Sequence, residues 1–126
     1  MSQPELPPIL REQLARYDQT QQNLQAVLAQ KQQVELELGE TEKALEELGK
    51  ASDSEEVYKF AGNLLVRAKK EDVVKDLNEK KEVASTRKMV LAKQESRFRE
   101  ALKDLQTKID EAVKPKPSQT QPPGDA

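Results

Sequence analysis

The sequence of 126 residues contains no cysteine and no histidine. Without cysteine, disulfide bonds and thiolate metal sites are excluded. Without histidine, the chain lacks the commonest general base and the commonest metal ligand. Tryptophan is also absent, and aromatic residues make up only 3% of the chain, which argues against a globular core. We expect a protein that is not an enzyme and that uses no metal or cofactor.

Long apolar runs, glycine-rich loops and an excess of one charge are also missing. No stretch approaches the roughly 20 apolar residues that span a bilayer, and the polar start has no apolar signal core. Only four glycines are spread over the chain, too few for a phosphate-binding loop. The 21 basic and 23 acidic residues nearly cancel, so no basic surface attracts nucleic acid or a membrane. We expect a cytoplasmic protein with neither as partner.

What the sequence does contain is typical of long helices. Charged residues make up 35% of the chain, and a composition rich in Glu, Lys, Gln, Leu and Ala indicates helices that bury a narrow seam. No proline occurs between Ile9 and Lys114. This run predicts a mainly α fold: one helix from about Pro8 to Leu48 and a second from Lys69 or Lys70 onward, folded back into a long antiparallel two-helix coiled coil.

In the first helix, apolar residues recur mostly three or four positions apart, the spacing of a coiled-coil stripe. Between Leu24 and Val34 the frame shifts as though three residues had been inserted, which predicts a locally overwound supercoil. The expected stripe consists of Leu10, Leu14, Tyr17, the polar Gln21, Leu24, Val27 or Leu28, Val34, Leu38, Leu45 and Leu48.

The stripe of the second helix follows alternating steps of three and four without a break. Nine of its twelve positions, which are 74, 77, 81, 84, 88, 91, 95, 98, 102, 105, 109 and 112, are apolar. The three charged residues share one heptad position, and antiparallel pairing predicts opposite charges across the seam. The expected pairs are Lys81 with Glu40 or Glu42, Lys88 with Glu35, and Glu95 with Lys31.

The segment from Val57 to Arg67 differs from the rest because it does not follow a helical pattern. Two runs of β-branched, aromatic and apolar residues flank Gly62-Asn63, a pair that tolerates left-handed backbone angles, and this predicts a β-hairpin. Two isolated strands are marginally stable and leave unpaired N–H and C=O groups along both edges. We therefore expect the hairpin to pair with strands of other chains.

The remaining segments set the domain boundaries. Residues 1–8 form an expected flexible lead, and residues 9–114 hold the coiled coil with its hairpin at 57–67. Residues 115–126 contain four of the seven prolines and no apolar pattern, so this Pro-rich tail is expected to be disordered.

Three strings within residues 9–114 resemble the β class of prefoldin subunits, co-chaperones of archaea and eukaryotes. They are Lys43 to Leu48, Val57-Tyr58-Lys59, and Gly62 to Val66. The resemblance implies that one hairpin marks the β class, and that the hairpins of two α and four β chains assemble into an intersubunit double β-barrel. It further implies that the coiled-coil tips hold unfolded proteins without ATP and deliver them to a group II chaperonin. The family often has Asp where Lys69 stands, so the cap of the second helix is expected to be weaker or shifted.

Two groups of residues follow from this resemblance. The assembly residues are Val57, Tyr58, Phe60, Leu64, Leu65 and Val66, which supply apolar faces to the barrel, with Gly62 and Asn63 in the turn. The client-binding residues at the tip are Leu6, Ile9, Leu10, Leu14, Phe98, Leu102, Leu105, Ile109 and Val113. The alternative is that these residues simply continue the seam, with Leu105 facing Tyr17 and Ile109 facing Leu14. Leu6, Ile9 and Val113 fit less well inside it.

A different class of function also fits the helical periodicity. The chain could be a coiled-coil scaffold or adaptor that dimerises through its helices and binds one specific protein. Helical spacing alone does not separate the two hypotheses, whereas the hairpin does, because a scaffold has no need of strands that build a barrel.

Overall fold

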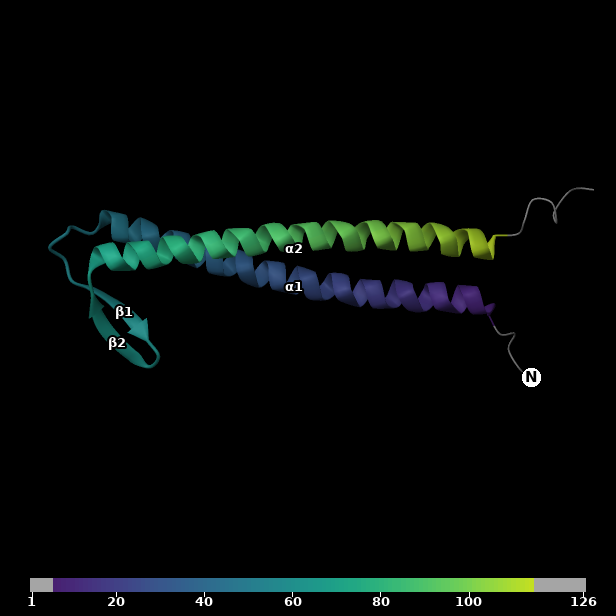
Figure 1. Ribbon diagram of the computed structural model, residues 1–126, viewed down its shortest axis with the longest axis horizontal. Coiled ribbons are helices and arrows are strands. Elements are labelled where there is room, and N and C mark those ends of the chain that lie inside the picture. The colour runs from purple at the N-terminus through teal and green to yellow at the C-terminus, as the bar shows by residue number, and fades with distance from the viewer. Residues whose placement is uncertain (1–5, 115–126) are drawn as a thin grey trace, which may run out of the picture. The chain divides into compact units, whose positions relative to one another are not determined.

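The computed structural model of the protein describes residues 6–114. Helix α1 (Pro8–Lys50) is followed by strands β1 (Val57–Ala61) and β2 (Leu64–Ala68) and by helix α2 (Lys70–Val113) (Figure 1). This confirms the predicted order of two long helices joined by one hairpin. Residues 1–5 and the whole predicted Pro-rich tail, residues 115–126, lie outside the described residues.

The chain divides into two compact units. The hairpin unit is residues 27–94, and the terminal unit combines the chain up to Ala26 with the chain from Glu95 onward. Within each unit a portion of α1 and a portion of α2 lie side by side in opposite directions (Figure 1). Among residues 6–114 the buried apolar side chains are Leu10, Leu24, Val27, Val34, Ala84 and Leu91, of which only Val34 is fully buried. The core is therefore a narrow seam.

Helix α1 buries an unbroken stripe whose steps alternate between three and four. The stripe is Leu10, Gln13, Tyr17, Thr20, Leu24, Val27, Lys31, Val34, Leu38, Thr41, Leu45 and Leu48, all buried or half-buried. The predicted frame shift between Leu24 and Val34 is wrong. The prediction placed the apolar Leu14 in the stripe, but Leu14 is 40% exposed. The polar Gln13 occupies this stripe position instead. The heptad period, not polarity, decides which positions face the partner helix.

Helix α2 follows its predicted stripe closely. Ten of the twelve expected positions are buried or half-buried, and Lys81 and Ala112 are exposed. Within residues 6–114, neither Lys81 nor Lys88 forms an ion pair with the glutamates predicted opposite them. Long lysine side chains carry their ammonium groups into water, where hydration competes with pairing. The expected ion pairs of Lys81 and Lys88 are therefore absent from the described residues, although Lys81 lines the same surface pocket as Glu42. The pairing of Glu95 with Lys31 stays a prediction.

Strands β1 and β2 form an antiparallel pair in which Val57 lies opposite Ala68 and Ala61 opposite Leu64. The loop between them is Gly62-Asn63. Gly62 has a φ of 63°, and no non-glycine residue in the described chain has a positive φ. A positive φ at the first loop position alone matches a type II′ turn, whose twist suits the flanking strands. The predicted hairpin is confirmed, and it extends to Ala68.

The two glycines Gly62 and Gly39 allow a paired test of this turn. Gly62→Ala is expected to lower the free energy of unfolding by about 1 to 2 kcal/mol, because Ala disfavours a positive φ. Gly39→Ala, in the middle of α1 with no atom within 4 Å of the added Cβ, is expected to raise it by roughly 1 kcal/mol. Urea unfolding followed by circular dichroism measures both, and effects of the same sign would contradict the assigned turn.

Candidate functional site

The hairpin exposes apolar side chains on both of its faces. Because residues directly opposite in an antiparallel pair share a face, the register places Tyr58, Phe60, Leu65 and Arg67 on one face. The other face carries Val57, Lys59, Ala61, Leu64, Val66 and Ala68. Phe60 is 82% exposed, Leu64 68% and Leu65 60%. Within residues 6–114, no layer covers these side chains on either face.

The outer edges of the hairpin are also open. The sheet has two strands in the order β1-β2, so within residues 6–114 the outward backbone groups of each strand have no neighbouring strand. Exposed apolar edges of this kind are templates for pairing with further strands. The hairpin thus offers two apolar faces and two unpaired edges.

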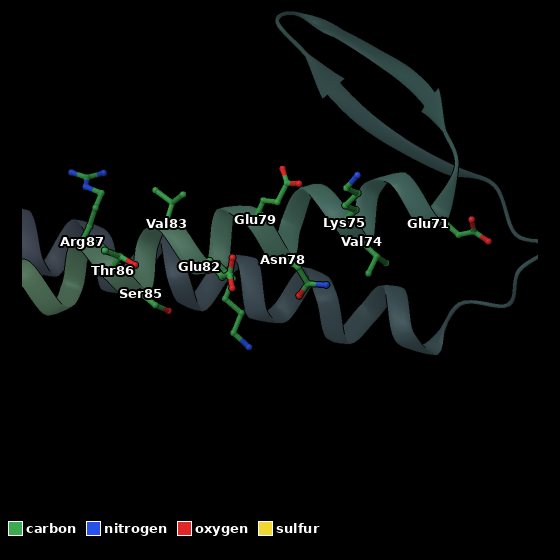
Figure 2. A pocket seen from close by; sticks show the side chains of 11 residues that line it. Glu71, Val74, Lys75, Asn78, Glu79, Glu82, Val83, Ser85, Thr86 and Arg87 are labelled. Carbon is green, nitrogen blue, oxygen red and sulfur yellow. The ribbon is translucent and has the colours of Figure 1, made fainter.

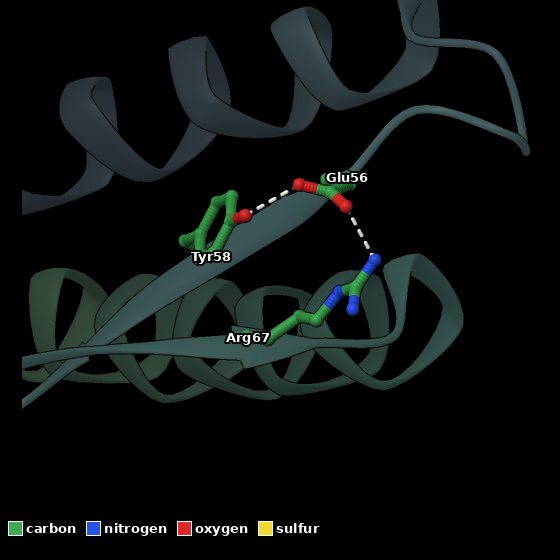
Figure 3. Close-up of polar contacts among 3 residues, drawn as sticks. All are labelled: Glu56, Tyr58 and Arg67. Carbon is green, nitrogen blue, oxygen red and sulfur yellow. Dashed lines mark hydrogen bonds and ion pairs between the residues drawn. The ribbon is translucent and has the colours of Figure 1, made fainter.

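A polar cluster at the base of the hairpin links its two strands. The carboxylate of Glu56 accepts hydrogen bonds from the Tyr58 hydroxyl and the Arg67 guanidinium (Figure 3). Tyr58 and Arg67 are direct cross-strand partners, so the three side chains join β1 to β2. Because all three are exposed, the cluster joins the two strands at the base of the hairpin and adds little to the stability of the fold.

Two lysines connect the hairpin region to the helices. Lys59 Nζ on β1 lies 3.9 Å from Asp76 Oδ2 on α2. Lys70 Nζ, at the start of α2, donates a hydrogen bond of 2.7 Å to the Ala51 carbonyl oxygen just beyond α1 and lies 3.6 Å from Asp53 Oδ1. Because Ala51 is the first residue after α1, the hydrogen bond from Lys70 links the chain just past the end of α1 to the start of α2.

A groove of about 1270 Å³ runs between β1 and the helices of the hairpin unit. Its apolar lining includes Leu48 of α1, Phe60 of β1 and Leu77 of α2, and its rim carries charged residues. A second pocket, of about 1190 Å³, is lined only by residues of α2. Figure 2 shows these side chains spread along one helix instead of converging on a point.

Two further searches of residues 6–114 bear on other site types. No group of three acidic side chains is placed to hold a metal ion. Neither helix contains a segment long and apolar enough to cross a membrane.

The terminal unit holds all nine predicted client-binding residues, near the start of α1 and the end of α2, which lie side by side (Figure 1). The structure separates them into two groups. Exposed on the surface are Leu6 (45%), Ile9 (68%), Leu14 (40%) and Val113 (60%). Buried or half-buried in the seam are Leu10, Phe98, Leu102, Leu105 and Ile109. Leu14, predicted to face Ile109 inside the seam, lies on its flank.

Comparison with known proteins decides the family. The sequence model of a protein family, described as prefoldin subunit, matches residues 11–116 of this chain. The prefoldin subunit beta of Archaeoglobus fulgidus is 48% identical over 111 residues, covering 88% of this chain and 96% of that protein. The chain belongs to the prefoldin beta subunit family. This confirms the resemblance carried by the hairpin and the end of α1.

Other prefoldin beta subunits are similar over nearly the same span. Those of Saccharolobus islandicus and Pyrococcus horikoshii are 43% and 40% identical over 108 and 110 residues, covering 86% and 87% of this chain and 86% and 94% of theirs. The crystal structure of the prefoldin beta subunit from Thermococcus strain KS-1 matches with a TM-score of 0.81 at 39% identity, covering 89% of this chain and 98% of that one. The mainly α fold with one hairpin is therefore the prefoldin beta fold.

Membership of the prefoldin family establishes two general points about function. Prefoldins are co-chaperones and not a known enzyme family. A prefoldin beta subunit is a component of a hetero-oligomeric prefoldin complex that contains alpha subunits.

Lys70 is a residue of this prefoldin subunit that sequence reasoning did not single out. The sequence pattern identifies Lys70 only as a candidate first residue of the second helix. Its hydrogen-bond partner Ala51 precedes it by 19 residues, and no regular spacing in the sequence connects the two. Basic residues near the end of a helix do favour its last carbonyls, but here the lysine comes from the following helix.

Lys70→Met tests this link. The variant is expected to lower the free energy of unfolding by about 1 kcal/mol, because it leaves the Ala51 carbonyl without its donor and keeps the aliphatic stem. Lys69→Met is the matched control: Lys69 is exposed, and its change is expected to stay within about 0.5 kcal/mol. Urea unfolding at one protein concentration compares the two, and equal effects would show that the Lys70 hydrogen bond contributes nothing.

Proposed function

We propose that the chain is the beta subunit of an ATP-independent co-chaperone that holds unfolded proteins at its coiled-coil tips and delivers them to a group II chaperonin. The observation that carries the proposal is the hairpin, whose apolar faces and unpaired edges have no partner within residues 6–114. Membership of the prefoldin beta family supports the co-chaperone class. Delivery to a chaperonin and a cytoplasmic location belong to the same proposal.

In the assembled complex, two alpha and four beta chains join their hairpins into a double β-barrel. Val57, Tyr58, Phe60, Leu64, Leu65 and Val66 are the proposed apolar assembly residues, and Gly62 and Asn63 form the turn. Fully burying one large apolar side chain contributes about 1.5 to 3 kcal/mol. Several such side chains on each hairpin, together with edge hydrogen bonds, support an association strong enough to offset the entropy lost on assembly.

At the tips, the four exposed residues Leu6, Ile9, Leu14 and Val113 offer an accessible apolar surface to a client. The five seam residues Leu10, Phe98, Leu102, Leu105 and Ile109 extend this surface where the terminal turns part. Each tip buries little area, so a single contact is weak. Several tips around one client raise the effective concentration and slow its escape, and weak individual contacts permit release without a nucleotide.

The alternative function, a scaffold or adaptor that binds one specific protein, accounts for the helices but not for the hairpin. A scaffold that dimerises through its seam gains nothing from exposing Phe60, Leu64 and Leu65 to water. Binding to nucleic acid or a membrane is not part of the proposal, because the net charge is −2 and no basic surface results from it.

Exposed residues of the hairpin test the assembly role. Because Phe60 and Leu65 are paired on one face and exposed, Phe60→Ser with Leu65→Ser is expected to abolish the hetero-oligomer with the alpha subunit while leaving the helical content unchanged. Sedimentation equilibrium measures the mass. Val83→Ser is the control, since Val83 on α2 is 61% exposed and lies outside the hairpin. A full hexamer mass for the double variant would refute the assembly role.

The four exposed tip residues test client holding. Changing Leu6, Ile9, Leu14 and Val113 together to Ser is expected to reduce the suppression of aggregation of an unfolded client several-fold without changing the complex mass, because none of them fills the seam. Leu36→Ser with Met89→Ser, which removes equally exposed side chains (58% and 60%) from the hairpin unit, is expected to have no effect. Unreduced suppression by the fourfold variant would exclude the tip as the holding site.

A further inference from the structure

The loop between α1 and β1 carries two serine hydroxyls that the proposed function does not use. Ser52 and Ser54 are exposed, and their Oγ atoms lie 3.0 Å apart. The Glu55 N–H donates a hydrogen bond of 3.1 Å to the Ser52 carbonyl oxygen, which closes a turn around both serines. The turn belongs to neither a helix nor a strand, so an enzyme can draw it into an active site without unwinding a helix or opening the strand pair.

The charges near the two loop serines distinguish them from the other serines within residues 6–114. The charged residues of the loop are all acidic and exposed: Asp53, Glu55 and Glu56. Ser85 and Ser96, in contrast, lie within α2, and an arginine follows each of them one or two positions further on. Protein kinases select substrates partly by the pattern of charge around the acceptor. An accessible serine followed by carboxylates suits a kinase whose substrate groove is basic.

Lys70 places a cation beside Ser52. Its ammonium donates a hydrogen bond of 2.7 Å to the Ala51 carbonyl oxygen and lies 3.6 Å from Asp53 Oδ1. Ala51 and Asp53 are the residues on either side of Ser52. The Lys70 side chain is only 24% exposed, so its charge is less hydrated than that of a surface lysine. An ammonium has three N–H groups, and the Ala51 carbonyl oxygen occupies one of them.

We propose that Ser52 is a phosphorylation site and that Lys70 binds the phosphate. In the modification, Ser52 Oγ attacks the γ-phosphorus of ATP and forms a new O–P bond. The bond from the γ-phosphorus to the β-phosphate oxygen breaks, ADP leaves, and the hydroxyl proton passes to a base of the kinase. The Ser54 hydroxyl, 3.0 Å from Ser52 Oγ, is placed to donate a hydrogen bond to the bound phosphate.

The phosphate is a better partner for Lys70 than the carboxylate now near it. The Asp53 side chain is fully exposed, and water competes with an ion pair at such a position. A phosphoserine carries about −1.5 to −2 charges at pH 7 and three strong acceptor oxygens. Hydrogen bonds between an ammonium and a phosphate are among the stronger ones in proteins because both groups are charged.

Lys70 also decides whether the phosphate stabilises or destabilises the fold. Ser52 follows the C-terminal end of α1, where a negative charge is unfavourable to the helix dipole. Asp53 and Glu55 repel the phosphate as well. The Lys70 ammonium offsets both effects and ties the end of α1 more firmly to the start of α2, at the base of the hairpin. Without this lysine, the phosphate is a negative charge among negative charges.

Peptide mass spectrometry of the chain isolated from its own cells tests the site. Growing, starved and heat-shocked cells are compared, each sample with and without phosphatase treatment. We expect phosphate at Ser52 in at least one of the three conditions and its loss after phosphatase treatment. Absence of phosphate at Ser52 in all three would overturn the assignment of this residue, whether or not Ser54 or Ser85 is modified.

A second measurement tests Lys70 as the partner of the phosphate. Phosphoserine is incorporated at position 52 during translation, both in the parent chain and in Lys70→Met. Urea unfolding at low salt is expected to show that the phosphate lowers the equilibrium constant for unfolding about threefold in the parent and raises it about threefold in Lys70→Met. Lys69→Met is the matched control and is expected to respond as the parent does. Equal effects of the phosphate in the parent and in Lys70→Met would overturn the proposed contact.

Discussion

The heptad seam between α1 and α2 is the constraint on which the other features depend. A pair of helices can bury only one stripe of each, and few side chains in the described chain are fully buried. Most of the other residues in 6–114 are exposed, and the groove and the pocket of the hairpin unit are open to solvent. Specific interactions with other molecules are therefore expected where the two helices no longer bury their stripes against each other, which is at the hairpin and at the ends of the helices.

These two places present apolar surface in different ways. The hairpin combines exposed side chains with backbone edges that demand hydrogen bonds, which favours a permanent and directional partner. The helix ends carry scattered apolar side chains and offer no strand edge, which suits weak contacts with varied sequences. A permanent interface and a transient one can thus coexist on a chain that has almost no core, because the chemistry of their unpaired groups differs.

Much of the fold could be predicted from the sequence because local patterns determine it. The proline-free run and the 3.5-residue period give the helices, and Gly62-Asn63 gives the hairpin. The stripe of α2 was predicted well because most of its positions are apolar. The stripe of α1 was not, because Gln13 and Thr20 occupy positions that polarity assigns to the surface. Only packing against the partner helix reveals that these residues are covered.

The site was less predictable for the same reason. Exposed β-branched and aromatic residues marked the hairpin, and terminal apolar residues marked the tip. The division of the tip residues into an exposed and a seam group depends on which side of α1 faces α2, so Leu14 was misplaced. Contacts such as that of Lys70 with the Ala51 carbonyl join segments that have no common spacing. Gln13 Oε1, which is buried and has no hydrogen-bond partner within residues 6–114, can be recognised only when its surroundings are known.

The two-residue turn limits how the hairpin can change in length. Because side chains alternate between faces with a period of two, adding one residue to either strand exchanges its whole set of side chains between the two faces. The face carrying Phe60 and Leu65 would then receive residues from the face carrying Lys59 and Val66. Insertions in this hairpin are therefore compatible with its present faces only in even numbers per strand, whereas insertions in the helices preserve the seam only in whole heptads.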